Sequence, residues 1–362
     1  LYTLLIMFPV VASAQINTDR VMAIGRNALY FEDYVLSIQY FNQVINAKPY
    51  LSDPYFYRGL AKINLDDFQG AESDCSEAIE RNPFVVSAYQ VRGLARIQQN
   101  NFAGAIEDYT KALEFDPENI GVWHNMALCR IRQEDYKGAK NDLDKLIAIS
   151  PRYTKAYLMR GEVDLKQKDT LAAEKDFGKA IEIDRCDADT WASRAILRLQ
   201  QQRYKDAEAD FDHAIRLSTR NSGVYINRAL ARYHQNNLRG AMSDYDIALD
   251  IDPNNFIGHY NRGLLRAQVG DDNRAIQDFN FVIEMEPDNM MAIFNRGLLL
   301  DQTGDYKGAI KDYSTVINEY PNFLLGYQYR AQARRKIGDV KGADADEFKV
   351  LKAQLDKQNG VE

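Results

Sequence analysis

Proline recurs along this chain at a fixed spacing of 34 residues or a multiple of it. The prolines in phase are Pro49, Pro83, Pro117, Pro151, Pro253, Pro287 and Pro321. A self-similar period of this length indicates an array of stacked helical hairpins. Such an array grows by adding units, so 362 residues need no single enlarged core. We therefore expect the chain to work mainly through extended surfaces.

Placing the proline at position 32 of each unit gives ten repeats without an insertion. They start at Thr18, Ser52, Val86, Ile120, Thr154, Ala188, Ser222, Phe256, Met290 and Leu324. Position 8 is Gly or Ala, position 20 is Ala in nine repeats, and position 24 is mostly aromatic. Small residues at 8 and 20 let two helices approach closely, and positions 20, 24 and 27 share one helix face. This pattern predicts an all-α array of antiparallel helix pairs over residues 18–357, followed by a tail over 358–362.

The same positions resemble the tetratricopeptide repeat family, which has small residues at 8, 20 and 27, bulky residues at 4, 17 and 24, and proline at 32. The resemblance covers about 340 of the 362 residues. It implies a right-handed superhelical solenoid whose first helices line a concave groove. Repeats five and six carry Arg185 and Thr219 in place of the proline, and Thr170 replaces the bulky residue at 17. We expect a softer joint near residues 180–225.

The first fourteen residues carry no charge and end in small residues, Ala12-Ser13-Ala14, which fit a signal-peptidase site before Gln15. The segment is too short to span a bilayer. We expect residues 1–14 to be a signal peptide and the protein to be secreted or periplasmic, with no stable membrane span after cleavage. Because the chain opens on Leu1 without a basic n-region, we expect the precursor to start further upstream. The alternative is an apolar N-terminal helix that packs on the first repeat.

Charge and motifs argue against several classes of function. The 45 basic and 52 acidic residues lack the basic excess of a nucleic-acid-binding protein. The three cysteines (Cys75, Cys129 and Cys186) are far apart without a CxxC motif, so neither a redox nor a metal site is expected. The four histidines are scattered, and HExxH, GxSxG and phosphate-binding glycine motifs do not occur. We expect no catalytic residues, no cofactor and no enzymatic activity.

An internal pattern of arginine and aspartate distinguishes the repeats. Position 7 is Arg58, Arg92, Arg160, Arg194, Arg228, Arg262, Arg296 and Arg330. Position 23 is Asp74, Asp108, Asp142, Asp176, Asp210, Asp244, Asp278, Asp312 and Asp346. The first repeat has neither, offering Ile24 and Tyr40, and this joint absence predicts that the two positions pair as a structural clasp between helices. The alternative is a ladder that reads a ligand. Repeat four has Met126 at position 7, and Arg130 is the possible substitute partner of Asp142.

The family resemblance places positions 2, 5, 6, 9, 12 and 13 on the concave side. The groove candidates for partner binding are Phe56, Tyr57, His124, Asn125, Ile226, Asn227, His234, Tyr260, Asn261, Phe294 and Asn295. An amide both donates and accepts, which suits holding the backbone of an extended peptide. The alternative is that Asn at position 6 is only a common helix residue of the family. The basic pattern that clamps a C-terminal carboxylate is not matched, because Lys155 is the one basic residue at position 2.

The last repeat has Glu347 at position 24 and continues with polar residues: Lys349, Lys352, Gln354, Asp356 and Lys357. Such a unit is expected to be a polar cap. The function predicted overall is a non-enzymatic scaffold that binds a protein or peptide in its concave groove within the cell envelope. The alternatives are a structural subunit that assembles through its convex face and edges, and an accessory module of a separate enzyme. The sequence does not predict the oligomeric state.

Overall fold

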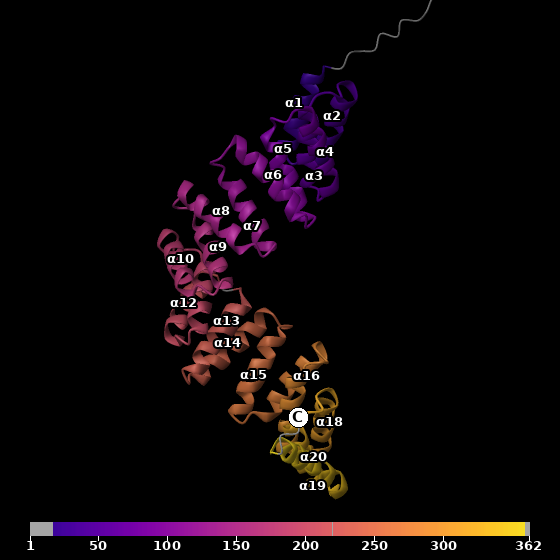
Figure 1. The fold of residues 1–362 in the computed structure, drawn as a ribbon, viewed down its shortest axis with the longest axis vertical. Coiled ribbons are helices and arrows are strands. Elements are labelled where there is room, and N and C mark those ends of the chain that lie inside the picture. The colour runs from indigo at the N-terminus through magenta and orange to yellow at the C-terminus, as the bar shows by residue number, and fades with distance from the viewer. Residues whose placement is uncertain (1–16, 219, 359–362) are drawn as a thin grey trace, which may run out of the picture. The chain divides into compact units, whose positions relative to one another are not determined.

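The computed structural model describes residues 17–218 and 220–358, which form twenty α-helices and no strand (Figure 1). The expected signal peptide over residues 1–14 lies outside the described residues. The first ten helices are α1 (Thr18–Tyr30), α2 (Tyr34–Ala47), α3 (Asp53–Ile63), α4 (Phe68–Arg81), α5 (Val86–Gln98), α6 (Phe102–Phe115), α7 (Ile120–Arg132), α8 (Tyr136–Ile149), α9 (Thr154–Lys166) and α10 (Thr170–Ile183). The others are α11 (Ala188–Gln200), α12 (Tyr204–Leu217), α13 (Ser222–His234), α14 (Leu238–Ile251), α15 (Phe256–Gln268), α16 (Asp272–Met285), α17 (Met290–Thr303), α18 (Tyr306–Glu319), α19 (Leu324–Lys336) and α20 (Val340–Gln358).

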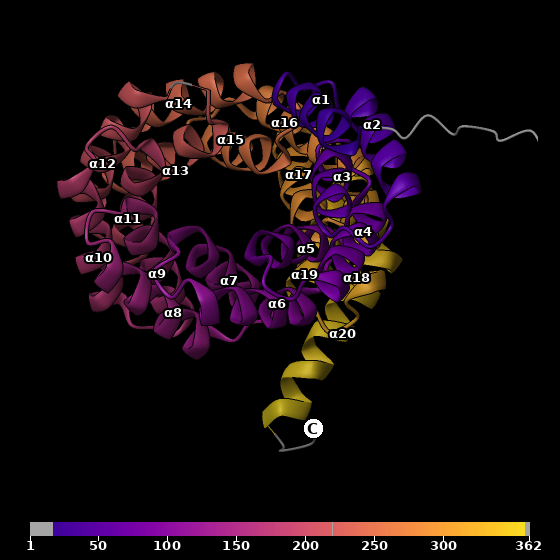
Figure 2. The same cartoon turned by 90° about the horizontal axis from the view of Figure 1, so that it is seen from above.

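Consecutive helices pair as antiparallel hairpins, so the predicted all-α array of helix pairs is confirmed. The chain divides into two compact units, one ending at Asp184 and the other beginning at Arg185. The first unit holds α1–α10 and the second holds α11–α20. Within each unit, the odd-numbered helices lie along the inner side of the stack and the even-numbered helices along the outer side (Figure 2). Each unit therefore presents one inner face made of the first helices of its hairpins.

Small residues at position 8 allow the two helices of a hairpin to touch. A Cβ atom added to Gly161 would lie 2.6 Å from Cε1 of Phe177 at position 24, far closer than carbon atoms pack. Phe177 is fully buried, as is Ala173 at position 20. The spacing of small and aromatic residues thus sets how closely α9 and α10 approach, because interiors pack to near-crystalline density.

Each hairpin turns at position 15, where the backbone is left-handed in all ten repeats. The residue is glycine only at Gly270, Gly304 and Gly338, with φ between 81 and 92°; the other seven are Glu32, Asp66, Asn100, Glu134, Lys168, Gln202 and Asn236, with φ between 59 and 64°. An Asp or Asn often follows and caps the second helix, as the Asp67 side chain accepts a hydrogen bond from the Gly70 amide. Most of these turns therefore form without glycine, and the helix cap that follows stabilises them.

The prolines are not required to end the second helices. Helices α10 and α12 lack the proline, yet they end at Ile183 and Leu217, in register with the others. In α10 the cap amide of Asp184 donates to the carbonyl of Ala180, as the corresponding amides do elsewhere. Among residues 17–218 and 220–358, no helix has the length and apolar character needed to cross a bilayer.

The last helix corrects the expectation of a polar cap. In α20, Leu355 replaces the proline at position 32, and the helix continues to Gln358. The large apolar residues Phe348, Leu351 and Leu355 are exposed along this helix. They share a face because they are spaced i, i+3 and i+7. The polar residues of α20 lie between these apolar side chains in the sequence but leave them exposed. The last helix therefore presents an apolar surface.

Candidate functional site

All eight predicted Arg–Asp pairs form between the two helices of their own hairpin. The closest N–O distances are 2.6 to 2.8 Å for Arg58–Asp74, Arg92–Asp108, Arg160–Asp176, Arg194–Asp210, Arg228–Asp244, Arg262–Asp278, Arg296–Asp312 and Arg330–Asp346. Every one of these carboxylates is buried, whereas the arginines keep some access to solvent. A planar guanidinium suits this role because it offers two parallel N–H groups to one carboxylate. The geometry places the pairs inside the hairpins as structural contacts.

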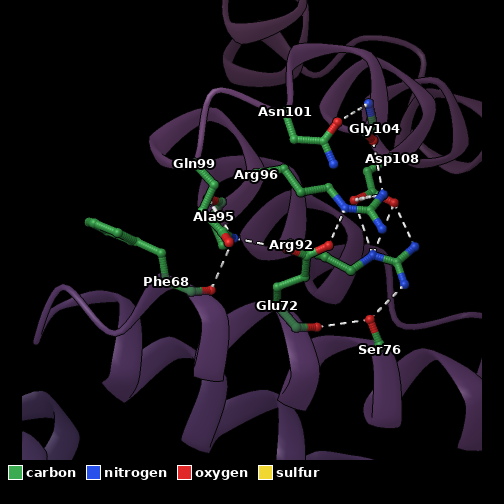
Figure 3. Close-up of polar contacts among 10 residues, drawn as sticks. All are labelled: Phe68, Glu72, Ser76, Arg92, Ala95, Arg96, Gln99, Asn101, Gly104 and Asp108. Carbon is green, nitrogen blue, oxygen red and sulfur yellow. Dashed lines mark hydrogen bonds and ion pairs between the residues drawn. The ribbon is translucent and has the colours of Figure 1, made fainter.

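The same arginines also connect neighbouring repeats. Arg92 donates from Nη1 to the hydroxyl of Ser76, 3.1 Å away in the preceding hairpin (Figure 3). Arg228 reaches Asp212 in the same way at 2.7 Å. The acceptor stands at position 25 of the preceding repeat in each case, so one arginine ties together three helices.

A cation at position 11 also contacts most of the buried carboxylates, and Arg130 is the one among these cations that was predicted to do so. Figure 3 shows Arg96 beside Arg92 at the carboxylate of Asp108, with Nη1 of Arg96 3.0 Å from Oδ2. The residues that do this are Lys62, Arg96, Arg130, Arg198, Arg232, Arg266 and Arg334. Their recurrence every 34 residues was the available signal. Two cations per carboxylate offset the cost of burying its charge.

Repeat four shows the consequence of losing one of these cations. Met126 occupies position 7, and Asp142 is held by Arg130, whose Nε lies 2.7 Å from Oδ2. Burial raises the pKa of the Asp142 carboxyl above its ordinary value of 3.8, and the attraction of Arg130 only partly opposes this. Arg130 also contacts Asp135, so its charge is shared.

The N-terminal groove candidates lie on the inner helices and mostly pack on other side chains. Tyr57 stacks on the buried Phe41 with ring centroids 5.8 Å apart, and Phe56 contacts Tyr57. Nδ1 of His124 is 3.3 Å from the Tyr153 hydroxyl. Burial and the nearby Lys155 lower the pKa of His124, which favours its neutral form. Asn125, the remaining candidate in this unit, is half-buried on α7.

The C-terminal candidates are brought together more closely, with one exception. Ile226 is buried, with 7% of its surface exposed, so it offers little surface to a partner. Its role as a groove contact stays a prediction. On α17, Asn295 donates from Nδ2 to the Tyr260 hydroxyl of α15 at 3.1 Å. His234 stacks on Tyr204.

Two open pockets adjoin these candidates in the second unit. One, of about 340 Å³, is lined by Asp288, Asn289, Met290, Met291, Phe294, Val316, Tyr320 and Phe323. The other, of about 280 Å³, is lined by Phe256, Ile257, Tyr260, Asn289 and Met291. They share Asn289 and Met291, so together they form one apolar surface, which we call the methionine surface.

The sequence also contains a pattern that indicates the methionine surface, although it was not among the predictions. Position 2 is Ile257, Met291 and Leu325 in the last three repeats, and all three side chains are exposed. Earlier repeats have Asp, Ser, Gly or Lys at this position. Exposed large apolar groups in consecutive repeats are typical of a binding surface. Two of the predicted candidates, Tyr260 and Phe294, line the pockets.

Two amides on the same side have unused hydrogen-bonding capacity. Within the described part of the chain, the side chains of Asn227 and Asn261 form no hydrogen bond with another residue. Both are only partly buried. An exposed carboxylate, Asp288, stands at the rim of the larger pocket, and Glu286 lies in the same loop. The surface therefore combines apolar pockets, free amides and negative charge.

The groups that most often perform catalysis are dispersed. His213 stacks on Trp191, and His259 contacts Asp278 and the Pro253 carbonyl. Over residues 17–218 and 220–358, no group of three His, Cys, Asp or Glu side chains is arranged to hold a metal ion. Burial raises the pKa of Cys75 to about 12 and that of Cys129 to about 11, so both thiols stay protonated at neutral pH.

Comparisons with known proteins agree with the helical-hairpin architecture. A family model described as TPR repeat matches residues 93–129, and two models described as Tetratricopeptide repeat match residues 193–256 and 260–322, and residues 120–153 and 154–185. No curated protein matches the chain in sequence.

Solved structures are similar in fold at low sequence identity. A tetratricopeptide repeat protein from Parabacteroides merdae is 21% identical with a TM-score of 0.53, over 69% of this chain and 98% of its own. The C-terminal part of a TPR repeat-containing protein from Cytophaga hutchinsonii is 17% identical with a TM-score of 0.54, over 66% and 97%. The pilF protein of Pseudomonas aeruginosa is 19% identical with a TM-score of 0.51, over 60% and 97%. At these identities the similarity concerns the fold alone.

Proposed function

Because this chain belongs to the tetratricopeptide repeat family, a fold of protein-interaction scaffolds, we propose that it binds a segment of a partner polypeptide on the inner face of its second unit. The observation that carries the proposal is the methionine surface, where two pockets adjoin on α15 and α17. The scaffold performs no chemistry itself in this proposal.

The composition of the surface favours a peptide with apolar side chains. Met291 and Phe294 offer deformable and aromatic contacts of the kind that dominate binding energy at interfaces. Asn261 lies one helical turn after Ile257 on α15, and its free amide can donate to and accept from a peptide backbone. The carboxylates of Asp288 and Glu286 favour a Lys or Arg near the apolar side chains of the ligand.

The proposal is tested with peptides selected from a random library against the intact protein. Their affinity is then measured for the double variant Asn261→Ala/Phe294→Ala, and for Met291→Asp. Truncating a central aromatic contact costs about 2 kcal/mol or more, so we expect binding about thirtyfold weaker for the double variant. Circular dichroism checks that helicity is intact.

A matched control is the double variant Phe56→Ala/Tyr57→Ala, which removes two aromatic groups from the inner face of the first unit. The selected peptides should bind this control as they bind the intact protein. Equal affinity for the intact protein and for both variants of the methionine surface would contradict the proposal. Weaker binding by the control alone would move the site to the first unit.

The location in the cell envelope is part of the same proposal. It is supported by the uncharged segment over residues 1–14 and its small residues before Gln15. N-terminal sequencing of the mature protein from a host with a secretion pathway tests it, and a chain that keeps residues 1–14 would contradict it.

A further inference from the structure

Position 25 of one repeat and position 7 of the next form the same kind of contact at seven of the nine internal junctions; the exceptions are Thr110 with Met126 and Gly178 with Arg194. At seven internal junctions, the arginine at position 7 donates to a polar side chain at position 25 of the preceding repeat, over 2.6 to 3.1 Å. The acceptors are Asn42, Ser76, Asp144, Asp212, Asp246, Asn280 and Ser314. These seven junctions therefore join a charged donor to a polar acceptor.

Both members of this pair change together in the first and last repeats. Position 25 of the last repeat is Phe348, which is 66% exposed, and position 7 of the first repeat is Ile24, which is 37% exposed. An apolar residue at either position alone would oppose an arginine or a polar group. Opposite each other, the two would form an apolar contact.

Positions 14 and 17 supply further exposed apolar groups in the first and last repeats. Gln99 at position 14 donates to Glu72 at 2.8 Å and weakly to the Phe68 carbonyl of the preceding repeat at 3.4 Å (Figure 3). Position 14 of the first repeat is Phe31, which is 77% exposed. Position 17 of the last repeat is Val340, which is 52% exposed. Apolar residues stand at position 14 inside the array as well, at Leu65, Val269 and Ile337, so Phe31 and Val340 add apolar surface of a kind that internal junctions already contain.

Position 28 packs against position 3 of the next repeat inside the array and is exposed in the last helix. At position 28, the Ile317 Cγ2 would lie 2.5 Å from a Cβ added to Gly326 at position 3 of the next repeat. The corresponding Leu351 in the last repeat is 53% exposed. The first repeat has Arg20 at position 3, where the later repeats have Gly, Ala, Pro, Thr or Val, so Leu351 would approach α1 less closely than Ile317 approaches Gly326 and would lie against the methylene groups of Arg20.

We propose that copies of this chain associate head to tail, with α20 of one copy packing on α1 of the next as an internal repeat would. A second copy is the occupant because Phe348 and Ile24, the apolar replacements of one polar pair, lie in the last and first repeats, and the exposed Val340 and Phe31 add apolar surface to the same two repeats. Terminal repeats of soluble arrays usually have a polar outer face, which α20 lacks. A contact between two different surfaces of the same chain produces open filaments or closed rings.

The test uses two single variants of the intact chain and their mixture, followed by sedimentation velocity over a range of concentrations. Phe348→Asp and Ile24→Arg each place a charge against an apolar residue, so each variant should dissociate at least about tenfold more readily than the unaltered chain. Mixing the two variants should restore assembly. The mixed junction would pair arginine with aspartate, as Arg228 and Asp212 pair at 2.7 Å within the chain.

A matched control is Leu171→Asp, because Leu171 is a highly exposed leucine on α10, away from both ends of the array. It should assemble as the unaltered chain does. A monomer at all concentrations, or a mixture that stays dissociated, would overturn the proposal. Dissociation by Phe348→Asp without any effect of Ile24→Arg would also overturn it, because that result indicates tail-to-tail pairing of α20. Peptide binding to the methionine surface should be unaffected by either variant, so this proposal and the proposed function fail separately.

Discussion

The buried carboxylates differ in how many cations hold them, and this difference predicts unequal effects of the same substitution. Asp244 is held by Arg228 through two hydrogen bonds of 3.0 and 2.6 Å and also by Arg232 at 2.8 Å. Asp312 is held by Arg296 through bonds of 2.8 and 2.7 Å. Its repeat has Leu300 at position 11, so within the described residues Arg296 is its one ion-pair partner.

Removing the arginine should therefore cost more in the ninth repeat than in the seventh. Arg296→Ala leaves a buried carboxylate without a cation, and losing one partner of a buried pair costs about 3–5 kcal/mol. Arg228→Ala leaves Asp244 with Arg232, so the loss is closer to that of hydrogen bonds to a charged group, about 1.5–3 kcal/mol. Both exceed the loss of about 0.2–1 kcal/mol that is typical of an exposed pair.

The measurement is urea unfolding of both variants, combined with hydrogen exchange resolved by peptide. Exchange is needed because long arrays often unfold in parts, and it reports the opening of α16–α18 and α13–α14 separately. Arg296→Lys is the matched control, since it keeps the charge but loses the planar fork, and its effect should lie between those of the intact chain and Arg296→Ala. A loss of a few tenths of a kcal/mol in both alanine variants, or a larger loss for Arg228→Ala, would refute the reasoning.

Two further predictions concern the first unit and the thiols. Met126→Arg should add a second cation to Asp142 and lower the pKa of its carboxyl, which NMR titration measures. In the unaltered chain the folded pKa is raised, so the contribution of this carboxyl to stability is complete below pH 3.8 and is lost as the pH rises through the folded pKa. The variant should therefore gain most stability over the unaltered chain at pH values above that range. An unchanged pKa would contradict the expectation that an arginine at position 7 of this repeat pairs with Asp142. A thiol reagent at pH 8 should label the exposed Cys186 rapidly, and Cys75 and Cys129 only on unfolding, because burial keeps both protonated; rapid labelling of all three would contradict this.

The hairpins could be predicted from the sequence because local spacing determines them. The pairing of Gly161 with Phe177, for example, depends on size alone, and the repeat supplies the comparison ten times. The Arg–Asp pairs were accessible for the same reason, since the first repeat lacks both members. Contacts between residues of the same repeat can therefore be predicted from the sequence pattern of that repeat.

Features that depend on the neighbouring repeat were harder to predict. Ile226 lies at a groove position, but its side chain is buried. Most residues of α20 are polar, whereas the structure leaves the large apolar Phe348 exposed. Periodicity identifies the face on which a residue lies, and packing across the junction decides whether that face is covered.

Seven of the nine internal junctions pair position 7 with position 25 in the same way, and this bears on how such a gene changes length. Excision of the codons for residues 256–289 would bring Asp246 opposite Arg296, a pairing of the same kind as Arg262 with Asp246 in the present chain. Unequal crossing-over in steps of 34 codons would thus yield products whose new seam is already compatible. Loss of the first or last unit would instead remove Ile24 or Phe348. Selection is accordingly expected to tolerate gain and loss in the middle of the gene more readily than at its ends.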